Sequence, residues 1–75
     1  MLEPAQVRMA RAALDWSAKK LAAKAGLAHN TVARFEAGRD AMLDTVKRLE
    51  TALEKGGVIF IPRDAGGGPG VRLKR

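Results

Sequence analysis

The chain has 75 residues, enough for one small domain and too few for two, and such a domain buries a smaller share of its surface than a larger one. Its 14 Lys and Arg residues against 8 Asp and Glu residues give a net charge of +6, so a polyanion is the expected partner. The absence of cysteine and the single histidine exclude disulfides and the common zinc sites, and we expect neither a metal nor another cofactor.

Composition divides the chain into two parts. Residues 1–55 are rich in Ala, Leu, Lys, Arg and Glu, which predicts a helical domain. Residues 56–75 hold six of the eight glycines and two of the three prolines, so we expect a different, non-helical element there.

Two short helices are predicted in the first part of the helical domain. Pro4 suits the first turn of a helix, because the missing N–H of proline is no loss there, and Val7 and Leu14 follow on one face. Ser17 is a good N-cap for the second helix, which we expect to stop at Gly26.

Two more helices are predicted after the turn at residues 26 and 27. Val32 and Phe35 face inward in a third short helix that ends at Gly38. The fourth helix opens at Asp40 or a neighbour and continues to the double glycine at residues 56–57. The expected fold is therefore mainly α.

The second and third predicted helices, joined by a tight turn that contains Gly26, form a helix-turn-helix. The segment between Ser17 and Arg39 is strongly basic, because Glu36 is its only acidic residue. The basic residues in it are Lys19, Lys20, Lys24, Arg34 and Arg39. This pattern predicts binding to double-stranded DNA, since the phosphates attract such a surface.

The segment WSAKKLAAKAGLAHNTVARFEAG, residues 16–38, resembles the helix-turn-helix of the lambda-repressor-like family of bacterial and phage transcription regulators, also called the xenobiotic-response-element family. Typical features of the family are a polar cap, Leu-Ala on the buried face, Ala-Gly-Leu at the turn, a Thr-aliphatic pair and a Glu-x-Gly exit. Here these features are Ser17, Leu21-Ala22, Ala25-Gly26-Leu27, Thr31-Val32 and Glu36-Ala37-Gly38. The resemblance covers residues 4–55 and implies a DNA-binding transcription regulator, which we expect to be a homodimeric repressor that reads an inverted repeat.

The resemblance also implies which side chains contact DNA. In such proteins the start of the third helix enters the major groove, so base contacts are expected from His29, Asn30, Thr31 and Arg34. Those residue types suit the role, since Asn pairs with adenine and Arg with guanine. Phosphate contacts are expected from Ser17, Lys19, Lys20 and Arg39. A solvated or capping Asn30 and a plain surface His29 are the competing interpretations.

Two positions depart from the family pattern. Family members usually have Gln after the cap of the second helix, where this chain has Ala18, and Ser or Thr before the third helix, where it has Ala28. The first N–H groups of the third helix then need another acceptor, for which a DNA phosphate is one candidate.

The last twenty residues predict a β-hairpin, because GVIFIP and GVRLKR flank a glycine-rich loop. The first strand is apolar on both faces, which favours pairing with a second copy of the chain and recognition helices roughly 34 Å apart. The expected dimer contact consists of Val58, Ile59, Phe60, Ile61, Val71 and Leu73. A tail of the form GVxFI...GGGPGVRL is similar to that of a small subgroup of these regulators. The alternative is a disordered basic tail over residues 66–75.

Other functions remain open at this point. One alternative is an antitoxin-like module whose C-terminal strands bind a partner protein, and another is a nonspecific nucleic-acid binder. Repression and activation through RNA polymerase are not distinguished. With one histidine and neither cysteine nor tyrosine, the chain offers no catalytic combination, so we expect no enzyme. No apolar stretch approaches the roughly 18 residues that cross a bilayer, and no signal peptide is recognisable, so we expect a cytoplasmic, nucleoid-associated protein.

Overall fold

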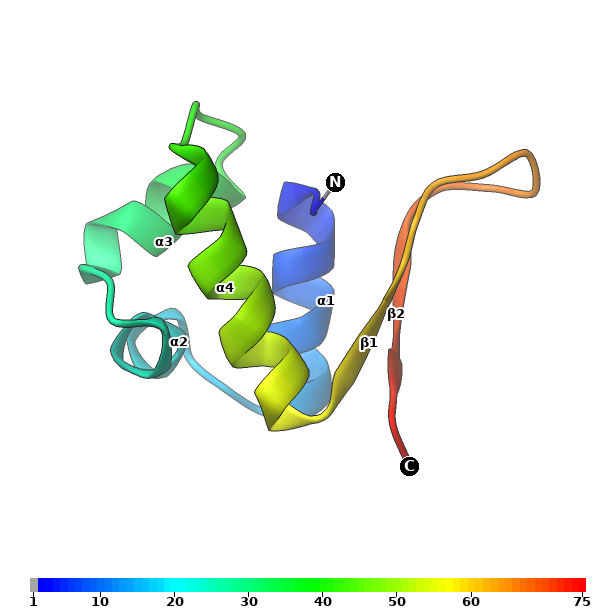
Figure 1. Cartoon of the computed structure of the whole chain (residues 1–75), viewed down its shortest axis with the longest axis horizontal. Helices are drawn as coiled ribbons and strands as arrows, with labels where there is room; N and C mark the ends of the chain where they lie inside the picture. Colours follow the sequence, from blue (N-terminus) through cyan, green and yellow to red (C-terminus); the bar gives the residue numbers. More distant parts are fainter. Residues whose placement is uncertain (1) are drawn as a thin grey trace.

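In a computed structural model that describes residues 2–75, four helices are followed by a two-stranded antiparallel sheet (Figure 1). The elements are α1 (Pro4–Leu14), α2 (Ala18–Ala25), α3 (His29–Glu36), α4 (Leu43–Gly56), β1 (Val58–Ile61) and β2 (Gly70–Leu73). The mainly α fold with a C-terminal hairpin is confirmed. No helix among the described residues has both the length and the apolar character needed to cross a bilayer.

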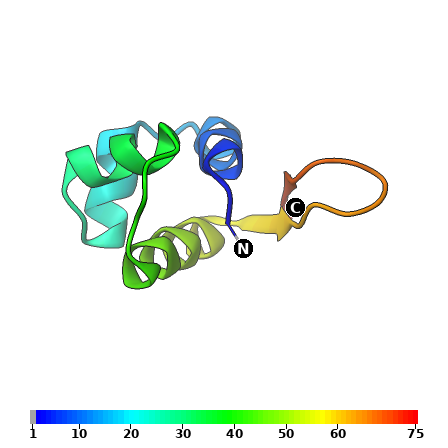
Figure 2. The ribbon, with the colours of Figure 1, turned by 90° about the horizontal axis from the view of Figure 1, so that it is seen from above.

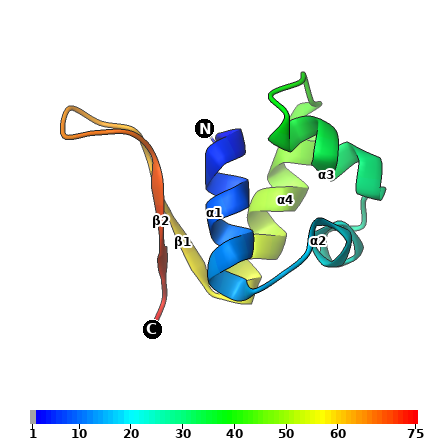
Figure 3. The ribbon, with the colours of Figure 1, turned by 180° about the vertical axis from the view of Figure 1, so that it is seen from behind.

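The elements form three layers along the longest axis of the molecule, which extends 34 Å (Figures 1 and 2). One end is formed by α2 and α3, the middle by α1 and α4, and the other end by the hairpin. The view from behind shows the same order, with α1 beside the strands (Figure 3). Because α1 contacts α3 as well as both strands, it joins the two ends of the molecule.

The helix ends follow from local sequence. Ser17 caps α2, since its Oγ accepts the N–H of Lys20 at 3.0 Å. Gly26 ends α2 with a φ of 70°, a left-handed conformation that glycine adopts at little cost. Both predicted signals are confirmed.

The start of α4 differs from the prediction, and its end at the double glycine is confirmed. The helix begins at Leu43 rather than near Asp40, because its first backbone hydrogen bond runs from the Val46 N–H to the Met42 carbonyl and no side chain caps an earlier turn. At the other end, Gly56 is the last helical residue and Gly57 is the cap. A Cβ on Gly56 would lie 2.7 Å from Cη2 of Trp16, so the indole packs directly over this glycine.

The core joins all four helices to the hairpin. Its largest fully buried side chains are Val7, Leu21, Val32, Leu49, Leu53 and Val58. Phe35 is 7% exposed, which confirms its predicted place in the core. Trp16 is half-buried and packs against the core. Burial of such side chains stabilises the fold by about 1.5–3 kcal/mol each relative to exposure.

The hairpin has one covered face and one open face. Its register pairs Ile59 with Arg72, and Phe60 with Val71. Val58 and Phe60 face the helices, whereas Ile59 and Ile61 point outward and are 44% and 37% exposed. The alternative of a disordered tail is wrong for residues 70–73, because they form β2 and pair with β1.

Polar side chains attach the hairpin to the start of α1. Gln6 is only 2% exposed, and its Nε2 donates to the carbonyls of Ile61 and Gly70, both at 3.0 Å. At the surface, Arg63 Nη2 lies 2.9 Å from Oε1 of Glu3. Hydrogen bonding to Arg63 lowers the pKa of the Glu3 carboxyl, and the pKa of Arg63 is raised in turn. These contacts attach the part of the hairpin beyond Val58, its only side chain in the buried core.

Candidate nucleic-acid interface

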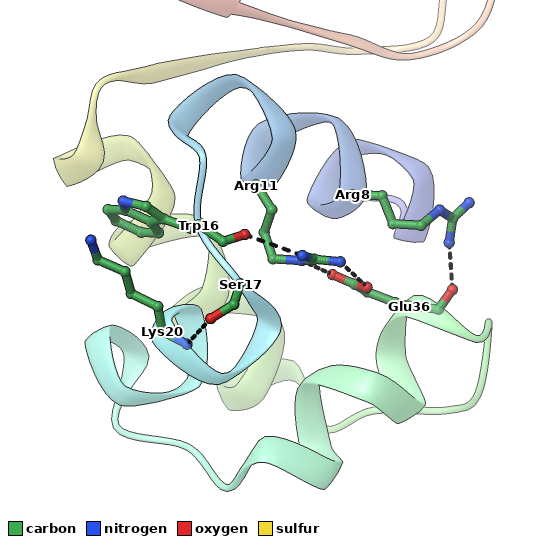
Figure 4. A network of polar contacts seen from close by, with 6 residues as sticks. All are labelled: Arg8, Arg11, Trp16, Ser17, Lys20 and Glu36. Atoms are coloured by element: carbon green, nitrogen blue, oxygen red, sulfur yellow. Dashed lines mark hydrogen bonds and ion pairs between the residues drawn. The ribbon is translucent and has the colours of Figure 1, made fainter.

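The N-terminal end of α2 presents the residues that were predicted to contact phosphates. Ser17, Lys19 and Lys20 are all exposed, and the hydroxyl of Ser17 is already engaged with the backbone of Lys20 (Figure 4). The cap leaves the other first-turn N–H groups of α2 facing outward, where an anion is favoured by the helix dipole.

The recognition candidate, α3, has distinct inner and outer faces. Val32 and Phe35 are buried, while His29, Asn30 and Arg34 are exposed. Thr31 is half-buried at the edge between the faces. No side chain caps the start of α3, as the alanine at position 28 predicted.

Small residues open a hollow on the outer face of α3. It has a volume of about 370 Å³ and is lined by Asn30, Ala33, Arg34, Ala37 and Arg39. A second hollow, of about 230 Å³, contains Thr31 and Arg34 together with residues of the loop before α4. The structure therefore groups Asn30, Thr31, Arg34 and Arg39, while His29 lines neither hollow. Ser17, Lys19 and Lys20 lie apart, on α2.

An ion pair that the sequence did not reveal positions α3. Arg11 of α1 donates from Nε and Nη2 to the two carboxylate oxygens of Glu36 at 2.6 and 2.8 Å, and from Nη1 to the carbonyl of Trp16 at 3.2 Å (Figure 4). Arg8 donates to the backbone carbonyl of Glu36. Through Arg11, α1 fixes both the end of α3 and the segment that leads into α2.

The pair is largely shielded, with side-chain exposures of 23% for Arg11 and 12% for Glu36. Hydrogen bonding to Glu36 raises the pKa of Arg11 further, so the guanidinium stays charged. One sequence signal for this contact existed: Glu36 is the only acidic residue in an otherwise basic segment.

The arrangement of α2 and α3 agrees with a comparison to protein families. A helix-turn-helix family profile matches residues 7–58, which is more than two thirds of the chain. The chain belongs to the lambda-repressor-like helix-turn-helix family. This helix-turn-helix domain is of the kind found in DNA-binding transcription regulators. No curated protein matches the chain.

Beside the helix-turn-helix, two lysines of α2 lie over the indole of Trp16. Lys20 Nζ is 5.8 Å and Lys24 Nζ is 5.7 Å from the ring centroid. At these distances the ring attracts both ammonium groups. Trp16 thus packs on the end of α4. It also attracts two lysines of α2, Lys20 near the start of that helix and Lys24 in its last turn.

The hairpin residues that were predicted to contact a second copy of the chain fall into a buried and an exposed group. Val58 has no exposed surface, because it belongs to the core of its own chain, and Phe60 and Val71 are half-buried. Ile59, Ile61 and Leu73 remain exposed, the last by 43%. Val58 therefore has no surface left to meet another molecule.

Proposed function

We propose that the protein is a sequence-specific transcription regulator that inserts α3 into the major groove and represses a promoter. The observation that carries this proposal is the outer face of α3, where Asn30 and Arg34 flank a hollow opened by alanines. Asparagine and arginine are the side chains best suited to read adenine and guanine. Val32 and Phe35 beneath them give the helix a rigid support.

Roles follow from position. We assign base contacts to His29, Asn30, Thr31 and Arg34 on α3. We assign phosphate contacts to Ser17, Lys19 and Lys20 at the start of α2 and to Arg39 after α3. A phosphate near the uncapped first turn of α3 also gives its N–H groups an acceptor.

We further propose a homodimer that is joined through the hairpins. The order of the layers restricts how the hairpins can meet, because the strands lie at the opposite end of the molecule from α2 and α3 (Figure 1). If two outer faces met, the two α2–α3 layers would point away from each other. If the strands pair edge to edge into one four-stranded sheet, both α2–α3 layers lie on the same side of it.

Edge-to-edge pairing therefore suits an inverted repeat whose half-sites are about one helical turn, roughly 34 Å, apart. It also satisfies backbone groups that an isolated two-stranded sheet leaves open at its edges. The location in the cell that follows from this function is the cytoplasm, on the nucleoid.

A second candidate function is favoured by the open face of the hairpin. In an edge-paired dimer, Ile59 and Ile61 stay exposed on the side away from α3. A partner protein seated there, as in an antitoxin-like complex, leaves the DNA-reading face free. In this second function the protein still binds DNA, and it also binds a partner protein, which it either recruits to the DNA or inhibits.

The first experiment is sequencing of genomic DNA fragments that the purified protein retains at near-physiological salt. We expect a shared inverted repeat. Arg34→Ala should lose discrimination at one base pair in each half-site, by about 1–3 kcal/mol or roughly 5- to 150-fold. Arg72→Ala is the matched control, because it removes an arginine from the hairpin's outer face. Retained DNA fragments that share no common motif would contradict the proposal of a sequence-specific regulator.

A second experiment separates the two ways in which the hairpins can meet. Ile59→Asp places a charge on the outer face and should leave the dimer intact in sedimentation, because edge pairing does not bury that side chain. Dissociation of the variant at concentrations where the parent protein is dimeric contradicts edge pairing and indicates contact through the outer faces.

A further inference from the structure

Three surface hollows are linked by shared lining residues, and together we regard them as one groove. The first, of about 240 Å³, lies between the last turn of α2 and the exposed face of α4. It shares Lys24 and Lys55 with a hollow of about 230 Å³ beside Trp16. That hollow shares Lys55 with a third, of about 460 Å³, at the end of the chain. The groove thus runs from α2 across α4 to the end of β2.

We call this feature the basic groove. Six of the 14 basic residues of the chain line it: Lys24, Lys47, Arg48, Lys55, Lys74 and Arg75. No Asp or Glu side chain lines any of its three hollows. The residues assigned to DNA contacts, by comparison, include four Lys or Arg side chains, Lys19, Lys20, Arg34 and Arg39. More of the positive charge is therefore collected in this groove than on the face that reads DNA.

Few of these charges are neutralised within the chain. Among residues 2–75, only Arg48 of the six forms an ion pair, with Asp44 at 2.9 Å. Lys24 and Lys55 lie in the last turns of α2 and α4, where a cation also complements the helix dipole. That effect explains two positions, and Lys74 Nζ donates to the carbonyl of Glu54 at 3.0 Å. Among residues 2–75, the side chains of Lys47 and Arg75 form neither a hydrogen bond nor an ion pair.

We propose that the basic groove binds an acidic, extended segment of a partner protein. Charge complementarity calls for an anionic partner. Only the hollow at the end of β2, about 460 Å³, falls within the size range of ligand pockets, roughly 300–1,000 Å³, and the other two are smaller. Narrow hollows of this size suit side chains and a single peptide strand better than the broad surface of a duplex. The groove shares no lining residue with the two hollows on α3 and includes none of the residues assigned to DNA contacts, so the two sites use separate side chains.

The test uses the full chain saturated with an operator fragment and a synthetic peptide of twelve glutamates as the probe. Trp16, the only tryptophan, lines the middle hollow, so its fluorescence reports the binding. We expect the peptide to change the emission while the labelled DNA stays bound. A peptide of twelve glutamines is the control and should have no effect. Release of the DNA by the glutamate peptide overturns the proposal, because the two then compete for one surface.

Two double variants locate the site. Lys47→Ala with Lys55→Ala should weaken peptide binding at least about tenfold and leave operator affinity unchanged. Lys47→Arg with Lys55→Arg keeps both charges and should retain the peptide. Equal peptide affinity for the parent protein and the alanine variant contradicts the groove as the site. If operator affinity grows with longer flanking DNA and the alanine variant loses that gain, the occupant is DNA and the proposal is wrong.

This inference builds on the proposed function only through the operator fragment. If no sequence-specific fragment is found, the same peptide titration is carried out on the free protein, and its outcome still decides whether the groove binds acidic polypeptide. If the groove does not bind the acidic peptide, the assignment of α3 to DNA binding is unaffected.

Discussion

At each end of the molecule, one long polar side chain of α1 donates two hydrogen bonds to the neighbouring element, and these two pairs of bonds differ in kind. Arg11 holds α3 through two charged hydrogen bonds to the Glu36 side chain. Gln6 holds the hairpin through two neutral hydrogen bonds to the backbone of Ile61 and Gly70. The first attachment depends on two side chains, whereas the second depends on one, because its acceptors exist in any sequence.

The apolar support of the two ends differs as well. Val32 and Phe35 of α3 are both buried, but Val58 is the only fully buried side chain of the hairpin. Regions with few buried contacts open at lower free energy than the core. The hairpin should therefore separate from α1 more easily than α3 does, and the following changes test this difference.

The largest effect is expected from Arg11→Met. It leaves the shielded Glu36 carboxylate without its partner, which should lower the free energy of unfolding by about 2–3 kcal/mol, at the low end for buried pairs because some solvent reaches this one. Urea denaturation followed by circular dichroism measures the loss. Arg11→Met combined with Glu36→Leu should recover most of it. A double variant as unstable as the single one would show that packing, and not charge, is the cause.

A smaller and more local effect is expected from Gln6→Leu. The carbonyls of Ile61 and Gly70 lose a buried donor, at a cost of about 2 kcal/mol. Hydrogen exchange followed by NMR should show faster exchange in β1 and β2, with the amides of α4 nearly unchanged. Equal acceleration in the strands and in α4 would mean that the hairpin and the helices open together.

The smallest effect is expected from Arg63→Ala, which removes the surface partner of Glu3. The pKa of Glu3 lies below its ordinary value of 4.5 in the folded protein, so the pair stabilises the fold above that pH and loses its contribution as the pH falls. In the variant, NMR titration should return the Glu3 pKa towards 4.5. A Glu3 pKa that does not move would assign the shift to other groups.

The helices were predictable from local signals, as Pro4, Ser17 and Gly26 illustrate, because each acts within one turn of its position in the chain. The prediction for α4 failed at its start, where no capping side chain marks the first turn. The outer face of α3 followed from periodicity alone, since Val32 and Phe35 define the opposite face.

The two attachments to α1 were not predictable from periodicity. Arg11 and Glu36 are 25 positions apart, and Gln6 lies 55 and 64 positions from its two acceptors. Such contacts depend on how the elements pack, and a single sequence holds no repeating signal for them. For the same reason the basic groove was missed: Lys24 and Lys47 line one hollow, and Lys55 and Arg75 another, only after the elements of the domain have come together.

Gly56, at the end of α4, does more than end the helix, because it also makes room for the Trp16 ring. Glycine in a helix costs roughly 1 kcal/mol relative to alanine, yet at position 56 even a methyl group would lie 2.7 Å from the Trp16 ring. The indole, in turn, holds Lys20 and Lys24 at 5.8 and 5.7 Å. A side chain at position 56 is therefore opposed first by the Trp16 ring, and a substitution that displaced the ring would also move the two ammonium groups that lie over it.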